Sequence, residues 1–166
     1  MKISLHLIKC YISILLLVLT LTSCKKHSSI TKDEELPAET QVGANTFGCL
    51  IDGKVYTPDG VIGLPALTAS IQSDILSLYS RRKSTNEGVG LPVRNMVATG
   101  EYPITSETTY SGFDAAYPAI EGKIIITKYD KVKNIISGRF YFTGKNASTG
   151  KLISVTNGRF DINFTN

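Results

Sequence analysis

Two arginines share the same local sequence and are the residues of this chain best suited to bind an anion. The tripeptide Gly-Arg-Phe occurs at residues 138–140 and again at residues 158–160. In an antiparallel meander these segments would lie parallel, one strand apart, so that Arg139 and Arg159 face the same side roughly 10 Å from each other. Such a pair predicts anion binding, because guanidinium groups donate paired hydrogen bonds to carboxylates and phosphates. The alternative is that each arginine covers an outer sheet face and pairs with Asp161 or a neighbouring carboxylate.

Three tyrosines form a second candidate contact surface. Tyr102, Tyr110 and Tyr117 lie within residues 100–122, a segment rich in Gly, Pro, Ser and Thr. Tyrosine supplies a large contact area at low conformational-entropy cost, so these side chains are candidates for binding a ligand or another protein. The alternative is packing in the core or at its rim. A glycan is the second choice of ligand, because sugars commonly stack on large aromatic rings and the chain has no Trp, although Tyr can substitute.

The residues available for catalysis are limited. His6 and His27 are the only histidines, so residues 28–166 hold neither a His-based catalytic triad nor a His-ligated zinc. A glycosidase needs two carboxylates about 5 to 10 Å apart. The candidates are Asp114, Glu121, Asp130 and Asp161. Turn formation and solvation account for such residues, and no calcium-binding Asp-x-Asp-x-Asp loop occurs. We therefore expect a protein that is not an enzyme and that holds no metal or cofactor.

The N-terminus has the organisation of a signal peptide. Residues 1–9 carry Lys2 and Lys9 and no acid, and residues 10–22 form an apolar run of 13 residues. As a helix this run spans roughly 20 Å, which is short of the roughly 30 Å hydrocarbon core of a membrane. The pattern predicts a cleaved signal at residues 1–23 rather than a membrane-spanning anchor.

The end of this signal indicates lipid modification. Leu21-Thr22-Ser23-Cys24 resembles the bacterial lipobox, which implies that Cys24 becomes the lipidated first residue. Three acyl chains, at about 0.8 kcal/mol per buried CH₂, give stable attachment to a membrane. Lys25 stands where an Asp would hold an enteric lipoprotein at the inner membrane, so the resemblance favours the outer membrane, facing either the periplasm or the cell surface. The alternatives are a plain secretory signal and an uncleaved short anchor.

Cleavage changes the composition of the remaining chain. Loss of Lys2 and Lys9 leaves 16 basic against 14 acidic residues, and a net charge of +2 is too small to predict a nucleic-acid partner. Residues 24–45 are polar without strand or helix periodicity, which predicts a flexible tether. Residues 46–166 then form a single domain, in which Cys49 is the only thiol and is expected to be buried in a strand.

The domain is expected to be all-β. Short alternating runs are separated by Gly, Asn, Asp and Pro, and no window of 12 residues reads as an amphipathic helix. Asp52-Gly53 predicts a two-residue hairpin turn. Pro92 makes residues 89–97 a weaker, edge-type strand, and residues 100–122 read as loop with short strand pieces. Further strands are expected at residues 66–72, 75–82, 123–129, 134–143, 151–156 and 159–164.

Asn157-Gly158 is expected to be the last hairpin turn of the domain. The strand after it would then direct Phe160, Ile162 and Phe164 inward and Arg159, Asp161 and Asn163 outward. Eight or nine strands in about 120 residues bury their apolar faces by packing two sheets or by closing a barrel. We expect an antiparallel β-sandwich, with a β-barrel as the alternative.

Several segments together resemble a known family. Residues 45–54 read Asn-Thr-Phe-Gly-Cys-Leu-Ile-Asp-Gly-Lys, residues 136–140 read Ile-Ser-Gly-Arg-Phe, and residues 156–161 read Thr-Asn-Gly-Arg-Phe-Asp. With the lipobox, these resemble a group of small uncharacterised cell-envelope lipoproteins of Gram-negative bacteria. The resemblance implies a β-rich lipoprotein and carries no catalytic residue over. We expect a non-enzymatic binding or structural module, with a glycan-binding accessory lipoprotein as the alternative and a carboxylate-dependent hydrolase less favoured.

Overall fold

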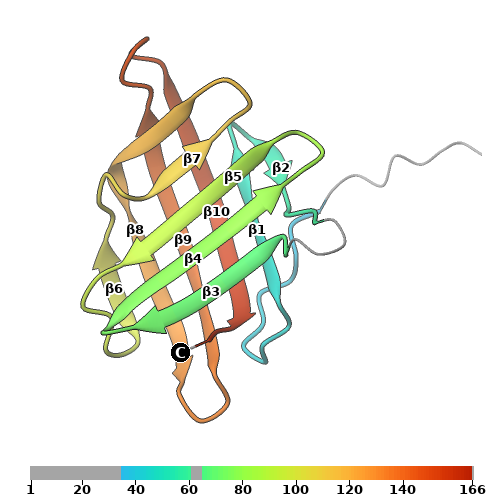
Figure 1. Cartoon of the computed structure of the whole chain (residues 1–166), viewed down its shortest axis with the longest axis vertical. Coiled ribbons are helices and arrows are strands. Elements are labelled where there is room, and N and C mark those ends of the chain that lie inside the picture. Colours follow the sequence, from blue (N-terminus) through green and yellow to red (C-terminus); the bar gives the residue numbers. More distant parts are fainter. Residues whose placement is uncertain (1–34, 61–64, 166) are drawn as a thin grey trace, which may run out of the picture. The chain divides into compact units, whose positions relative to one another are not determined.

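The domain is built from β-strands. The computed structural model describes residues 35–60 and 65–165, and Figure 1 shows the arrangement of their strands. The strands are β1 (Thr46–Ile51), β2 (Lys54–Tyr56), β3 (Leu67–Gln72), β4 (Ile75–Arg82), β5 (Glu87–Val93), β6 (Gly100–Pro103), β7 (Thr109–Ser111), β8 (Ala116–Asp130), β9 (Ile135–Lys145) and β10 (Leu152–Asn163). Neighbouring strands pair antiparallel, so the predicted all-β antiparallel fold is confirmed, with ten strands rather than eight or nine. Within the described ranges no helix is long and apolar enough to cross a membrane.

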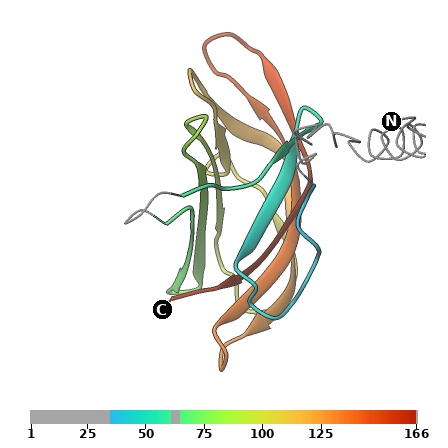
Figure 2. The same cartoon turned by 90° about the vertical axis from the view of Figure 1, so that its right-hand side faces the viewer.

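One continuous sheet connects these strands. Its order is β2-β1-β10-β9-β8-β7-β5-β4-β3, and β6 pairs with a later part of β8 than β7 does. The sheet turns a corner in β8, where the register slips between Ala119 and Glu121. Gly122 follows with φ 146°, and a Cβ there would lie 2.3 Å from the carbonyl oxygen of Tyr141, so this corner requires glycine. Figure 2 shows the result, in which the layer of β3, β4 and β5 faces the layer of β1, β8, β9 and β10.

Two short parallel bridges tie the ends of the sheet together. Asp59 pairs with Arg82 of β4, and Thr165 pairs with Ser70 of β3. The amide of Thr165 donates to the carbonyl of Ala69, and the Thr165 carbonyl accepts from the amide of Ile71, at 2.9 and 2.8 Å. The sheet thus curls into a half-barrel, a form consistent with both predicted architectures, the sandwich and the barrel.

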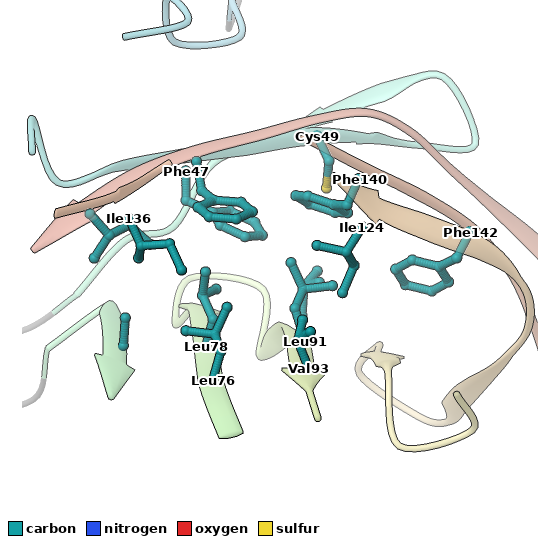
Figure 3. Packing of buried hydrophobic residues seen from close by; sticks show 14 of the residues in the cluster. Phe47, Cys49, Leu76, Leu78, Leu91, Val93, Ile124, Ile136, Phe140 and Phe142 are labelled. Atoms are coloured by element: carbon teal, nitrogen blue, oxygen red, sulfur yellow. The ribbon is translucent and has the colours of Figure 1, made fainter. Parts of the chain in front are cut away.

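The core fills the space between the two layers. Figure 3 shows Phe47 and Phe140 of one layer directed at Leu76 and Leu78 of the other, and all four side chains are almost fully buried. Cys49 lies in this core with no exposed surface, as expected from its place in a strand. Burial raises the pKa of its thiol to about 12, so Cys49 is protonated at neutral pH.

The expected hairpin at Asn157-Gly158 is wrong. β10 runs without interruption through both residues, and it uses one more residue than β9 between Val155 and Gly158. Asn157 has φ 52°, a conformation that Asn tolerates and that a β-bulge uses as readily as a type I′ turn does. The local sequence signal was therefore genuine, but it marks a bulge within one long strand.

Two other expectations need correction. β5 is not an edge strand, because it lies between β4 and β7 in the sheet order. However, β7 pairs only with Gly88–Gly90 of β5, so Pro92 lies beyond the end of that pairing. Residues 100–122 contain β6, β7 and the first part of β8, more regular structure than the predicted loop.

Candidate functional site

The repeated Gly-Arg-Phe tripeptides lie directly opposite each other. β9 and β10 are antiparallel neighbours, and their register pairs Gly138 with Phe160, Arg139 with Arg159, and Phe140 with Gly158. A Cβ on Gly158 would lie 2.6 Å from the Phe140 ring, and a Cβ on Gly138 would lie 2.6 Å from the Phe160 ring. Each phenyl ring thus occupies the space above the opposite glycine. The repeat is a reciprocal packing arrangement on the inner face, and it places two arginines side by side on the outer face.

This geometry corrects the expected placement of the arginines. They do face the same side, but their strands are adjacent and antiparallel instead of parallel and one strand apart. Directly opposed residues have Cβ atoms about 4.5 to 5.5 Å apart, half of the predicted separation. Like charges in that position destabilise a sheet, so the pair favours the approach of an anionic group.

Residues 35–45 form a strap across the outer face of the sheet. A Cβ on the buried Gly48 would lie 2.5 Å from Cδ of Pro37, so the strap lies directly on β1 at this glycine. Further along, the Gln41 carbonyl accepts a hydrogen bond of 2.8 Å from Lys128 Nζ of β8. The sequence predicted a flexible tether over residues 24–45. Its final part is instead held against the sheet, and residues 24–34 lie outside the described residues.

Asp161 anchors the strap. Its carboxylate accepts hydrogen bonds of 2.6 to 3.1 Å from Thr40 Oγ1, from Ser137 Oγ and from the three backbone amides of residues 42–44. Burial alone would raise the pKa of Asp161, but these hydrogen bonds outweigh burial and lower the pKa to about 2. Asp161 was expected to be solvated on an outward strand face, and in the alternative account of the arginines it was one possible partner for them. It is instead 1% exposed beneath the strap.

Glu39 of the strap supplies the anion at the arginine pair. One oxygen, Oε2, lies 2.8 Å from Nε and 2.6 Å from Nη2 of Arg139. The side chain of Arg139 remains 60% exposed and that of Glu39 43% exposed. Arg159 instead donates long hydrogen bonds of 3.3 and 3.4 Å to the neutral carbonyls of Pro37 and Asn157. The three charged side chains together carry one net positive charge.

Two surface hollows adjoin this cluster, and both are lined by Glu39, Arg139 and Arg159. The first, of about 210 Å³, lies along residues 38–41 of the strap and reaches Thr127. The second, of about 420 Å³, extends in the other direction over Ile125, Tyr141, Thr156 and Asn157. If the Glu39 carboxylate moved away, a ligand in either hollow could contact both guanidinium groups.

Comparison with known proteins assigns the chain to a family. Residues 65–161 match the family described as Domain of unknown function (DUF6252). The chain belongs to this family. Neither the curated proteins nor the solved structures contain a match. The matched region begins before β3 and ends at Asp161, so it includes both arginines and the strap anchor, whereas the strap and β1 precede it.

The three candidate tyrosines are packing residues in the structure. Tyr110 is buried, and its hydroxyl donates to Glu87 Oε1 at 2.5 Å. Its ring lies 5.8 Å from that of Tyr117, centroid to centroid, and Tyr117 packs against the core. Tyr102 also packs there, with its hydroxyl donating to the Ala98 carbonyl at 2.7 Å. This placement fits the alternative of core and rim packing, and Tyr117 also lines a surface hollow of about 720 Å³ together with Asp114 and Asn146.

A fourth tyrosine, which the sequence interpretation missed, stands beside the arginines. Tyr141 is 48% exposed and lies two residues after Arg139 in β9. The alternation of a strand puts residues 139 and 141 on one face, so the signal was present once residues 134–143 were read as a strand.

The candidate carboxylates are dispersed. Glu121 and Asp130 lie nine residues apart in β8, or roughly 30 Å at the rise of a strand. Asp130 accepts hydrogen bonds from the amides of Val132 and Lys133 in the following turn. Asp114 lies between β7 and β8, and the Asp161 carboxylate is bound to the strap. Among the described residues no group of three or more His, Cys, Asp or Glu is placed to hold a metal ion. Cys24, the expected lipidation site, lies outside them.

Proposed function

We propose that this chain is a lipid-anchored cell-envelope protein whose domain is a non-enzymatic binding module for an anionic group, carried by a ligand or by another envelope protein. The observation that carries the proposal is the direct opposition of Arg139 and Arg159 on an outer sheet face, where the single carboxylate of Glu39 contacts Arg139. Two guanidinium groups offer up to ten N–H donors, and Glu39 engages those of Arg139 alone.

The contact with Glu39 supports the proposal because it displays the chemistry of the site within the chain. The carboxylate of Glu39 is bound by two donors of one arginine, as an external carboxylate or phosphate would be. An ion pair at this exposure contributes about 0 to 1 kcal/mol, so a ligand that engages both arginines can displace Glu39 at little cost.

The anchor rests on the lipobox-like sequence ending at Cys24. Ten residues separate Cys24 from Glu35, where the described strap begins. Fully extended, this segment reaches at most about 40 Å, so a lipid on Cys24 would keep the binding site near the surface of the outer membrane. Labelling of cells with a radioactive fatty acid tests the anchor. The label should enter the wild-type chain and be absent from Cys24→Ala, and equal labelling of both would refute lipidation at this residue.

Binding is tested on the full chain in detergent micelles by titration with citrate, followed by NMR. Saturable shifts are expected in β9 and β10 of the wild type, with loss of saturation in the double variant Arg139→Gln/Arg159→Gln. The matched control is Lys145→Gln, which removes an exposed cation from the same face of β9. If the double variant binds citrate like the wild type, the arginine pair is not an anion site.

A further inference from the structure

The second hollow combines three features that a sugar acid requires. Tyr141 offers a half-exposed aromatic face, Ile125 adds an apolar surface in register with Arg139, and the guanidinium groups of the pair stand at the same hollow. Apolar faces of sugar rings pack on aromatic rings, while a carboxylate selects arginine. This combination distinguishes the hollow from a site for a bare inorganic anion, which has no use for Tyr141.

The spacing agrees with a ligand of this kind. Arg139 and Tyr141 are two residues apart on one strand, about 7 Å along β9. That offset matches the scale of one sugar ring, so a ring stacked on Tyr141 brings an attached carboxylate to the guanidinium groups. The next residue on the same face is Thr143, whose hydroxyl donates to Glu121 at 3.0 Å. The face therefore continues as a polar surface along which a chain of sugars can extend.

Glu39 already occupies the carboxylate position. Its oxygen sits on Nε and Nη2 of Arg139, and its side chain is exposed enough to rotate away. The strap donors to Asp161 are Thr40 Oγ1 and the amides of residues 42–44, all of which follow Glu39, so rotation of the Glu39 side chain leaves the Asp161 anchor in place. The strap thus provides an internal competitor that a stronger carboxylate ligand replaces.

We propose that the hollow formed by Tyr141, Ile125 and the arginine pair binds an acidic glycan, with a sugar ring on Tyr141 and its carboxylate on Arg139 and Arg159 in place of Glu39. The proposal rests on the anion-binding function proposed above and adds the class of ligand. It assigns Tyr141 as the residue that selects a sugar acid over a simple anion.

The test measures binding of the full chain in detergent micelles to three acidic polysaccharides, polygalacturonate, alginate and hyaluronan, by calorimetry. The matched neutral ligand is fully methyl-esterified polygalacturonate. At least one acidic polymer should bind at least about 10-fold more tightly than the ester. The ester has no carboxylate and therefore loses a charge-assisted pair of hydrogen bonds with the arginines. Absence of binding to all three polymers, or equal binding of ester and acid, overturns the proposal.

Single variants distinguish the contribution of the Tyr141 ring to binding from the contribution of the charged side chains. Tyr141→Ala should weaken binding of the acidic polymer roughly 3-fold to 10-fold, and Tyr141→Phe should retain it, because stacking needs the ring and not the hydroxyl. Tyr79→Ala is the matched control, because Tyr79 is 47% exposed but lies on β4 in the other layer. Glu39→Gln should strengthen binding by removing the competing carboxylate.

The outcomes also distinguish this inference from the proposed function. If citrate binds in an arginine-dependent manner while Tyr141→Ala leaves polysaccharide binding unchanged, the anion site stands and the glycan inference fails. If the double arginine variant binds both citrate and polysaccharide like the wild type, both fail.

Discussion

Replacement of Asp161 by Asn should release the strap and destabilise the domain. The substitution keeps the size of the side chain but removes its charge and one of its acceptor oxygens. It also places an NH₂ group among five donors, those of Thr40, Ser137 and residues 42–44. The side chain is 1% exposed, so water cannot replace the lost acceptor without movement of the strap.

The pKa of Asp161 sets the size of the effect. It falls from an ordinary value of 3.8 to about 2 because the hydrogen bonds from Thr40, Ser137 and the strap outweigh burial. A difference of this size between the folded and unfolded states corresponds to about 2.5 kcal/mol of stability at neutral pH. The pKa is lowered on folding, so this contribution is complete above about pH 5 and is lost as the pH falls from about 5 to 2.

Urea denaturation of the full chain, followed by circular dichroism, measures the free energy of unfolding at pH 7 and its dependence on pH. Asp161→Asn should lower the free energy of unfolding by about 2.5 kcal/mol or more at pH 7 and flatten its decline between pH 5 and 2. Hydrogen exchange should become faster at the amides of Val42, Gly43 and Ala44, which donate to this carboxylate. Glu121→Gln, at an exposed carboxylate of β8, is the control. It should change neither the free energy of unfolding nor the exchange of these amides.

Two results would refute this reasoning about Asp161. If Asp161→Asn unfolds at the same urea concentration as the wild type at pH 7, the carboxylate does not hold the strap. If the variant is less stable but its free energy of unfolding declines between pH 5 and 2 as in the wild type, the stability comes from packing around Asp161 and not from its charge.

Three further predictions follow from the core and the lipid anchor. Gly158→Ala should destabilise the domain by about 1 to 3 kcal/mol in urea denaturation, because its methyl group would meet the Phe140 ring at 2.6 Å; an unchanged midpoint would show that the ring moves freely. Cys49 should react with iodoacetamide in urea and not in the folded protein, because burial raises its pKa to about 12; rapid labelling of folded protein would contradict its burial. Inhibition of lipoprotein signal peptidase should leave residues 1–23 attached to the wild-type chain, as mass spectrometry would detect; complete processing would contradict the lipobox interpretation.

Local sequence rules predicted much of the fold. Alternation located the strands at residues 75–82 and 134–143, and Asp52-Gly53 forms the expected turn between β1 and β2. These features depend on side chains a few residues apart, which a single sequence displays. Asn157-Gly158 shows the limit of such rules, because a bulge and a hairpin turn demand the same backbone conformation at Asn157. Only the pairing of β10 with β1 and β9 distinguishes them.

The candidate site was predicted in part. The repeat of Gly-Arg-Phe drew attention to Arg139 and Arg159, and both face the same side of the sheet as expected. The predicted separation of the two arginines was wrong, since it depends on which strands are neighbours, and the sequence did not identify Glu39 as the carboxylate that pairs with Arg139. Glu39 is 100 residues from Arg139 in sequence, and Thr40 is 121 residues from Asp161. Neither residue belongs to a motif, so no local pattern indicates that residues 35–45 lie on the sheet.

Two contacts of the strap, those of Asp161 and Glu39, differ in strength, and this difference makes a ligand-responsive site physically reasonable. The Asp161 anchor is buried, engages five donors and contributes about 2.5 kcal/mol through its lowered pKa. The Glu39 contact is exposed and is worth about 0 to 1 kcal/mol. An anion that engages both arginines therefore competes with the weak Glu39 contact and not with the Asp161 anchor. Ligand binding should therefore free the Glu39 side chain, while residues 42–44 and Pro37, which lies on Gly48, remain on the sheet.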